Sequence, residues 1–235
     1  MRIGLFIPCY IDQFYPRVGI ATLELLEKLN LKVEYPLSQT CCGQPLCNAG
    51  FAEDAVGTRE HFFRNFSKFD FVVSPSGSCV FHLKEQFKSP NSSEKFARLN
   101  QATFELCAFL IRVLKVKELR GSFPHKVAVH EGCHNLRGLS SRSYEKQLLN
   151  KLEEIKIQDF DRQEECCGFG GTFSVKEEAV SVKMGKDKIR RIENSGAEIV
   201  TSGDMSCLMH LEGLLIKNKS NLKAMHISEI LNQAM

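Results

Sequence analysis

Short apolar runs alternate with amphipathic segments along the chain, and the same order occurs in both halves. The short runs predict buried β-strands, and apolar positions three and four residues apart predict helices. In the first half we expect strands at 2–8, 31–35 and 71–74, and helices at 16–29, 52–66 and from 78 onward. In the second half we expect strands at 126–130, 155–157 and 197–201, and helices at 143–152, 176–192 and from 205 onward.

This alternation predicts an α/β fold of two tandem, pseudo-symmetric βαβαβα units with parallel sheets and right-handed crossovers. Between the halves, 92–116 is predicted as one long helix, bounded by the SPNSS segment at 89–93 and the GSFP turn at 121–124. We therefore expect a first unit at 1–90, a connecting helix within 91–124 and a second unit at 125–235.

The composition is that of an ordinary globular protein, because 43% of the 235 residues are hydrophobic and 25% are charged. The net charge is +3 with both signs interspersed, so no nucleic-acid partner is expected. No apolar run approaches the roughly 20 residues of a membrane span, and the first run is too short for a signal peptide. We expect a cytoplasmic protein, either free or held at the inner membrane through partners.

Eight of the ten cysteines repeat at an offset of about 125 residues. The pairs are Cys9 with Cys133, Cys41 with Cys166, Cys42 with Cys167, and Cys79 with Cys207. Their surroundings repeat as well, since TCCGQP pairs with ECCGFG, and SGSCVFHL pairs with SGDMSCLMHL. Cys47 and Cys107 have no counterparts and are predicted to be packing residues. The chain is therefore interpreted as two copies of one unit.

The paired cysteines follow the first, second and third predicted strand of each half, at the carboxyl ends where α/β sheets bind ligands. In a reducing compartment such cysteines indicate metal or redox chemistry rather than disulfides. Four thiolates in each unit suit either a 4Fe–4S cluster or a zinc ion. The adjacent pair in each set favours the larger cluster, while zinc in one unit stays open. The predicted metal ligands are Cys9, Cys41, Cys42, Cys79, Cys133, Cys166, Cys167 and Cys207.

Two histidines occupy matching positions near these cysteines. His82 and His210 each lie three residues after a paired cysteine, so one helical turn separates them from it. They are expected either to donate hydrogen bonds to the site, to add a ligand, or simply to pack beneath it.

The second unit carries additional polar residues. His130 and His134 flank Cys133, where the first unit has Pro8 and Tyr10. With Arg137 they are candidates for catalysis, through proton transfer or the binding of an anionic group. The alternative is that they are ordinary polar residues at the end of a strand.

The duplicated motif resembles the CCG cysteine-rich domain, which occurs in heterodisulfide reductase and in the iron–sulfur subunit of anaerobic glycerol-3-phosphate dehydrogenase. The blocks IGLFIPCYIDQFYPRVGIATLELLEKL and CCGQPLCNAGF are most similar to the lactate utilization protein A family. The resemblance covers essentially the whole chain. It implies an iron–sulfur subunit of an L-lactate-oxidising oxidoreductase that converts lactate to pyruvate. The implied partners are a ferredoxin-like iron–sulfur subunit and a third small subunit.

One position departs from the family pattern, which ends in Cys-x-x-Cys. Ser76 and Asp204 stand where the first cysteine of that pair is expected. Four cysteines then remain in each unit, which favours two 4Fe–4S cubanes and electron transfer, although Asp204 could add a weak oxygen ligand. The alternatives are a zinc-stabilised scaffold subunit and a heterodisulfide-reductase-like thiol redox subunit.

Overall fold

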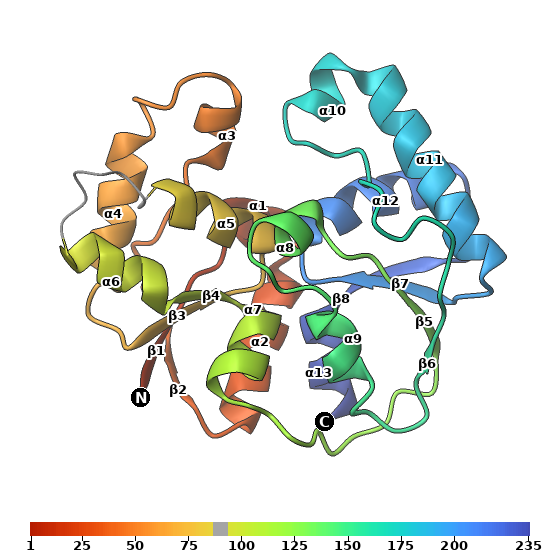
Figure 1. Cartoon of the computed structure of the whole chain (residues 1–235), viewed down its shortest axis with the longest axis horizontal. Helices are drawn as coiled ribbons and strands as arrows, with labels where there is room; N and C mark the ends of the chain where they lie inside the picture. The colour runs from red at the N-terminus through yellow and green to blue at the C-terminus, as the bar shows by residue number, and fades with distance from the viewer. Residues whose placement is uncertain (87–93) are drawn as a thin grey trace.

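The computed structural model describes residues 1–86 and 94–235, and contains two four-stranded sheets in which all strands are parallel (Figure 1). The first sheet has the order β2-β1-β3-β4. Its strands are β1 (Arg2–Leu5), β2 (Lys32–Glu34), β3 (Phe71–Ser74) and β4 (Thr103–Glu105). Apolar side chains of β1 and β3 are buried on both faces, as expected where helices cover a parallel sheet.

The second sheet repeats the first. Its order β6-β5-β7-β8 matches the first sheet strand for strand. Its strands are β5 (Lys126–Val129), β6 (Lys156–Ile157), β7 (Ile199–Ser202) and β8 (Lys223–His226). The predicted α/β fold of two tandem units is thus confirmed. The unit limits at 90 and 124 remain predictions.

Each sheet has a fourth strand that the sequence did not predict. β4 has only three residues, and two of the four residues of β8 are half-buried and one is exposed. Neither carries the apolar run that marks the other strands. β8 is followed by a further helix, α13 (Ile227–Ala234), so the helix predicted from 205, α12 (Met205–Lys217), is not the last.

The long helix predicted at 92–116 is wrong. The segment forms α6 (Glu94–Ala102), then β4, then α7 (Leu106–Ala108) and a single π-helical turn, η1 (Phe109–Val113). The break occurs because Glu105 ends the strand and its carboxylate accepts hydrogen bonds from two backbone N–H groups of α7. The start of the predicted helix at 92 and the SPNSS segment lie outside the described residues.

The remaining helices follow the expected order, with several short additions after the cysteines. The expected helices are α2 (Pro16–Lys28), α4 (Val56–Phe66), α5 (Gly77–Gln86), α9 (Tyr144–Leu149) and α11 (Glu178–Asn194). The short ones are α1 (Cys9–Phe14), α3 (Gln44–Asn48), α8 (Cys133–Arg137) and α10 (Phe173–Lys176).

The two units share one hydrophobic core. Helices α2, α7, α9 and α13 lie between the two sheets (Figure 1). α2 packs against α13, and α7 packs against α9. In each pair one helix follows a strand of the first sheet and the other follows a strand of the second. Leu25, Leu106, Leu148 and Leu231 from these four helices are fully buried in a single apolar cluster. The two units are therefore held in a fixed arrangement by apolar burial.

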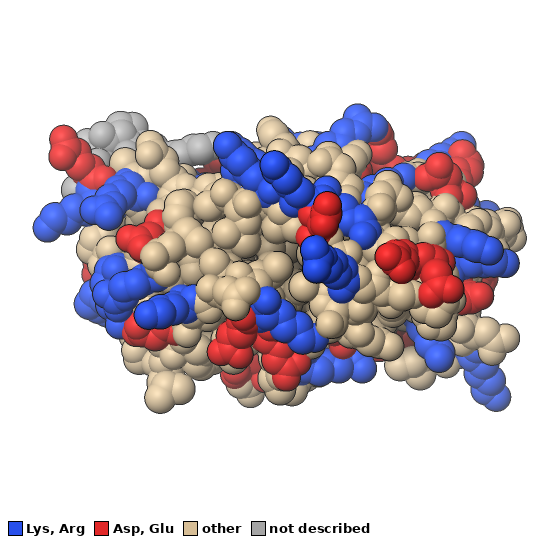
Figure 2. All heavy atoms as spheres, turned by 90° about the horizontal axis from the view of Figure 1, so that it is seen from below, with Lys and Arg blue, Asp and Glu red and all other residues tan. Residues whose placement is uncertain are grey.

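Among the described residues, no helix is long and apolar enough to cross a membrane. Figure 2 shows the face beneath the view of Figure 1, where the described acidic and basic side chains are interspersed. This face therefore presents no broad surface of one sign among the described residues.

Candidate metal centres

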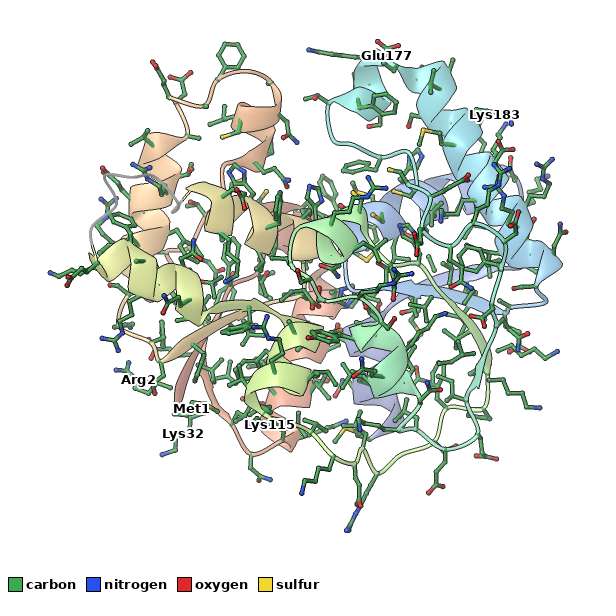
Figure 3. All side chains as sticks on the ribbon, in the orientation of Figure 1. Met1, Arg2, Lys32, Lys115, Glu177 and Lys183 are labelled. Atoms are coloured by element: carbon green, nitrogen blue, oxygen red, sulfur yellow. The ribbon has the colours of Figure 1, made fainter. Side chains whose placement is uncertain are left out.

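The cysteine-bearing segments meet at one edge of the molecule. Arg2 and Lys32, the first residues of β1 and β2, lie at the lower edge in Figure 3, and Glu177 at the start of α11 lies at the opposite edge. The short helices α3 and α10, which follow the cysteine doublets, also lie at that upper edge (Figure 1). In each unit the cysteines follow the carboxyl ends of the strands, as predicted.

In the first unit, four thiols form a continuous cluster, which we call site one: Cys9, Cys41, Cys42 and Cys79. Cys41 contacts both Cys9 and Cys42, and Cys42 contacts Cys79. The backbone N–H of Gly43 points at the Cys41 sulfur at 3.4 Å. Hydrogen bonds from Cys42 and Cys9 lower the pKa of Cys41. The hydrogen bond between Cys9 and Cys41 raises the pKa of Cys9.

The second unit repeats this cluster as site two: Cys133, Cys166, Cys167 and Cys207. Cys166 contacts Cys133 and Cys167, and Cys167 contacts Cys207. Two backbone N–H groups point at sulfurs, from Gly168 to Cys166 at 3.3 Å and from Phe169 to Cys167 at 3.5 Å. Hydrogen bonds from Cys133 and Cys167 lower the pKa of Cys166.

Glycine is required directly after each doublet. Gly43 and Gly168 have φ angles of 90° and 95°, in the left-handed region that side chains disfavour. A Cβ atom would lie 2.4 Å from Thr58 Oγ1 in the first unit and 2.6 Å from the Ser181 carbonyl oxygen in the second. These glycines let α4 and α11 pack closely against the two doublets.

The donor set fits a metal centre. All ten cysteines are free, and eight of them form two groups of four thiols in contact. Backbone N–H groups directed at sulfur stabilise thiolates, which are the form that binds metal. Cys107 lies in the apolar core, as predicted, and Cys47 is partly exposed on α3. The clustered cysteines therefore indicate metal binding, and four thiolates suit both cluster and zinc.

Ser76 and Asp204 meet between the two sites. Their backbones form an antiparallel bridge, and the hydroxyl of Tyr10 lies 3.1 Å from Ser76 Oγ and 3.3 Å from Asp204 Oδ1. Asp204 is buried, and it accepts hydrogen bonds from the N–H of Ser78 at 2.6 Å and from the N–H of Ser206 at 3.0 Å. The carboxylate thus caps its own helix, α12, and also the start of α5 in the other unit.

His82 and His210 lie beside the doublets. His210 Nε2 is 3.3 Å from the Ser181 carbonyl oxygen. The His82 ring contacts the backbone of Cys42, and its Nε2 has no hydrogen-bond partner among the described residues. Burial lowers the pKa of both histidines.

His130 differs from the other candidates because it is buried at site two. The backbone N–H of His130 donates to the Thr201 carbonyl oxygen at 2.8 Å. In the same way, the backbone N–H of Phe6 donates to the Val73 carbonyl oxygen at 2.9 Å. Phe6 is therefore the counterpart of His130. The predicted pairing of His130 with Pro8 was wrong, because Pro8 lies two residues beyond the position that matches His130. A nitrogen of His130 and the sulfurs of Cys167 and Cys207 all lie within 4.8 Å of one another.

His134 and Arg137 are placed differently. The ring of His134, the counterpart of Tyr10, lies tilted against Phe81 with ring centroids 5.1 Å apart, and its Nδ1 lies 3.8 Å from Cys133 Sγ. Arg137 is exposed at the end of α8, and its side chain makes no hydrogen bond or ion pair among the described residues. The three candidates for catalysis therefore do not form one group.

Sequence reasoning missed a buried lysine next to site two. Lys188 on α11 is 1% exposed, and its Nζ donates to the Gln163 carbonyl oxygen at 3.1 Å. Burial and, to a lesser degree, the charge of Lys188 lower the pKa of His130 to about 3. The signal was available, because Lys188 falls on the buried face of the helix with Gly185 and Ile192.

A buried acidic pair was also missed. Glu105 and Glu145 are both buried at the junction of the units, and a Cβ atom on Gly203 would lie 3.0 Å from Oε1 of each. Asn135 donates to Glu145 at 3.0 Å. Burial, followed by the neighbouring Glu145, raises the pKa of Glu105 to about 8, and burial raises the pKa of Glu145 to about 7.

Comparison with known proteins gives consistent results. The model of a family described as the CCG cysteine-rich domain matches residues 3–84 and 127–212. Lactate utilization protein A of Halalkalibacterium halodurans is 42% identical over 236 aligned residues, covering 99% of this chain and 97% of the relative. The protein of the same name from Bacillus subtilis is 38% identical, with 99% of each chain covered.

A solved structure shares the fold. The crystal structure of a hypothetical protein from Helicobacter pylori superimposes with a TM-score of 0.68 at 15% identity. It covers all of this chain, whereas this chain spans about half (49%) of that protein. At this identity the similarity concerns the fold alone.

Proposed function

The chain belongs to the lactate utilization protein A family, with two copies of the CCG cysteine-rich domain, and on this premise we propose that it is an iron–sulfur electron-transfer subunit of an L-lactate-oxidising complex. The observation that carries the proposal is the pair of four-thiol clusters at equivalent strand ends. The names of the relatives support lactate as the substrate of the system.

Sites one and two would each hold a 4Fe–4S cluster through their four cysteines. Such a cluster supplies one-electron transfer. Oxidation of lactate to pyruvate releases two electrons and two protons, so two one-electron centres match the electron count. Tyr10 supports cooperation between the sites, because its hydroxyl is within electrostatic reach of both Cys79 and Cys207.

Exposed apolar side chains near the sites support docking of partner proteins. Phe51 and Val56, which follow α3, are 58% and 41% exposed, and Val175 and Val180 on α10 and α11 are 81% and 52% exposed. We propose the exposed apolar side chains of these two segments as contacts for partner proteins. The partners proposed for this edge are a ferredoxin-like iron–sulfur subunit and a third small subunit, in a complex that functions in the cytoplasm or at the inner membrane.

The test is lactate-dependent reduction in the assembled complex. The anaerobically purified chain is combined with both partners, and the visible absorbance of its clusters is followed after L-lactate is added. The wild-type chain should be bleached, and a Cys41→Ala, Cys166→Ala double variant should neither bleach nor support pyruvate formation. Cys47→Ala, on the same segment as the first doublet, is the matched control and should behave as wild type. Equal pyruvate formation with the double variant would overturn the proposal.

A second candidate is favoured by one observation. The group formed by His130, Cys167 and Cys207 mixes imidazole and thiolate donors, a combination typical of structural zinc. In that case the second unit would be a zinc-stabilised scaffold beside a single redox site. Zinc and iron content of the purified chain distinguishes the two.

A further inference from the structure

Sites one and two have the same cysteines but different surroundings. Phe6 directly follows β1 in the first unit, and His130 directly follows β5 in the second. The backbone N–H of each donates to the neighbouring strand, β3 or β7, at the matching position. Both side chains are almost fully buried. The duplication has therefore placed an apolar ring at one site and an imidazole at the other.

The helices that pack behind the sites, α4 and α11, also differ, with an apolar side chain at site one and a polar one at site two. A Cβ atom on Gly43 would meet Ala55 and Thr58, and one on Gly168 would meet Ser181 and Met184. The two neighbours are three residues apart in both units, which sets α4 in register with α11. In that register Lys188 is the counterpart of Phe62. Phe62 packs edge-on against Phe6 with ring centroids 5.1 Å apart, and in the second unit Lys188 acts electrostatically on His130. An aromatic pair at site one is thus replaced by two nitrogen-bearing side chains at site two.

The imidazole of His130 lacks any hydrogen-bond partner among the described residues. It is 1% exposed, and both Nδ1 and Nε2 are unsatisfied there. A buried polar group without a partner destabilises the folded protein. One of its nitrogens lies within 4.8 Å of the sulfurs of Cys167 and Cys207, which are themselves within that distance of each other. A metal bound between these three atoms would satisfy the nitrogen.

We propose that His130 is a metal ligand at site two, so that this chain carries one all-thiolate centre and one mixed imidazole–thiolate centre. The inference rests on the proposed function, since it assumes that both cysteine clusters hold metal. His130 would then take the place of one of the four thiolates proposed above as ligands of site two. Imidazole in place of thiolate raises the potential of an iron–sulfur centre. The buried ammonium of Lys188, which acts on Cys167 and Cys207, favours the reduced and more negative state as well. Electrons that enter the chain would therefore settle at site two.

Nitrogen ligation can be observed directly by pulsed EPR of the reduced, anaerobically purified holoprotein. Protein grown with ¹⁵N-histidine and ¹⁴N elsewhere should show the ¹⁵N coupling of a metal-bound imidazole. This measurement needs no substitution, so it does not depend on whether a variant folds. If site two contains zinc, the same coupling is sought after cobalt(II) replacement.

Two reciprocal variants and one control complete the test. His130→Phe, which copies site one, should lose the histidine coupling, and Phe6→His should introduce a second one at site one. His210→Phe, at the same site but hydrogen-bonded to Ser181, should leave the coupling unchanged. In redox titrations His130→Phe should lower the potential of one centre only.

The failures of this inference and of the proposed function are distinguishable. Metal content is measured first. A chain that binds zinc but no iron overturns the proposed function alone, and a chain that binds neither metal overturns the ligand assignment as well. Metal at both sites without histidine nitrogen coupling, or with coupling that persists in His130→Phe, overturns the ligand assignment alone.

Discussion

Replacement of Asp204 by alanine tests whether this carboxylate joins the two units at the metal sites. The substitution removes the acceptor for the N–H groups of Ser78 and Ser206 and a hydrogen-bond partner of Tyr10. Loss of an N-terminal helix cap costs about 1 kcal/mol. The N–H of Ser78, which belongs to the other unit, would be left without its acceptor in a buried position, at a cost of about 1–3 kcal/mol. We expect the free energy of unfolding to fall by about 3 kcal/mol.

The assay is urea unfolding of the metal-free, reduced protein, followed by far-ultraviolet circular dichroism. A loss of about 3 kcal/mol is a large share of the roughly 5–15 kcal/mol that stabilises most domains. Asp204→Asn retains one oxygen acceptor and should lose about half as much. Ser76→Ala, at the equivalent position of the first unit, removes only weaker hydrogen bonds of 3.1 to 3.4 Å and should lose about 1 kcal/mol or less.

The opposite result would assign the carboxylate a different role. If Asp204→Ala were as stable as wild type or more stable, the carboxylate would not be a structural cap. An oxygen ligand held ready for metal would then explain the buried charge better, since removal of an unpaired charge relieves its desolvation cost.

Two further predictions concern the buried acids and the glycines. In the wild-type protein, the native state keeps a proton on Glu105 that the unfolded chain releases, so the free energy of unfolding declines between about pH 4.5 and 8. In Glu105→Gln this decline should become shallower. An unchanged slope in urea titrations across this range would contradict the raised pKa of Glu105. Gly168→Ala should destabilise the metal-free protein by more than Gly196→Ala, because both have positive φ but only the Cβ at 168 meets other atoms; equal unfolding midpoints would show that the packing behind the second doublet is not tight.

The duplication and the meeting of the cysteines could both be predicted from the sequence. Both follow from features that do not depend on long-range packing, namely apolar runs of strand length and cysteines placed directly after them. The parallel sheet then brings the carboxyl ends of the strands together. β4 and β8 escaped prediction because the first is very short and the second is only partly buried.

The roles of individual polar residues depended on how the two units pack. Spacing identified Asp204 as the residue in place of a cysteine, but not that it reaches α5 of the other unit. The counterpart of His130 follows from the hydrogen-bond register of β5 against β7, which nearness to a cysteine does not reveal. The predicted helix is interrupted at Glu105 because the Glu105 carboxylate caps the start of α7. The neighbouring residues are compatible with a helix, so the sequence did not indicate this break.

Quantification of iron, zinc and acid-labile sulfide in the anaerobically purified chain tests the central claim most directly. Two 4Fe–4S clusters predict about eight iron atoms and about eight sulfides per chain. The Cys41→Ala variant should lose about half of each, and Cys47→Ala should lose none. Stoichiometric zinc without iron or sulfide would contradict the assignment of this chain as an iron–sulfur electron carrier.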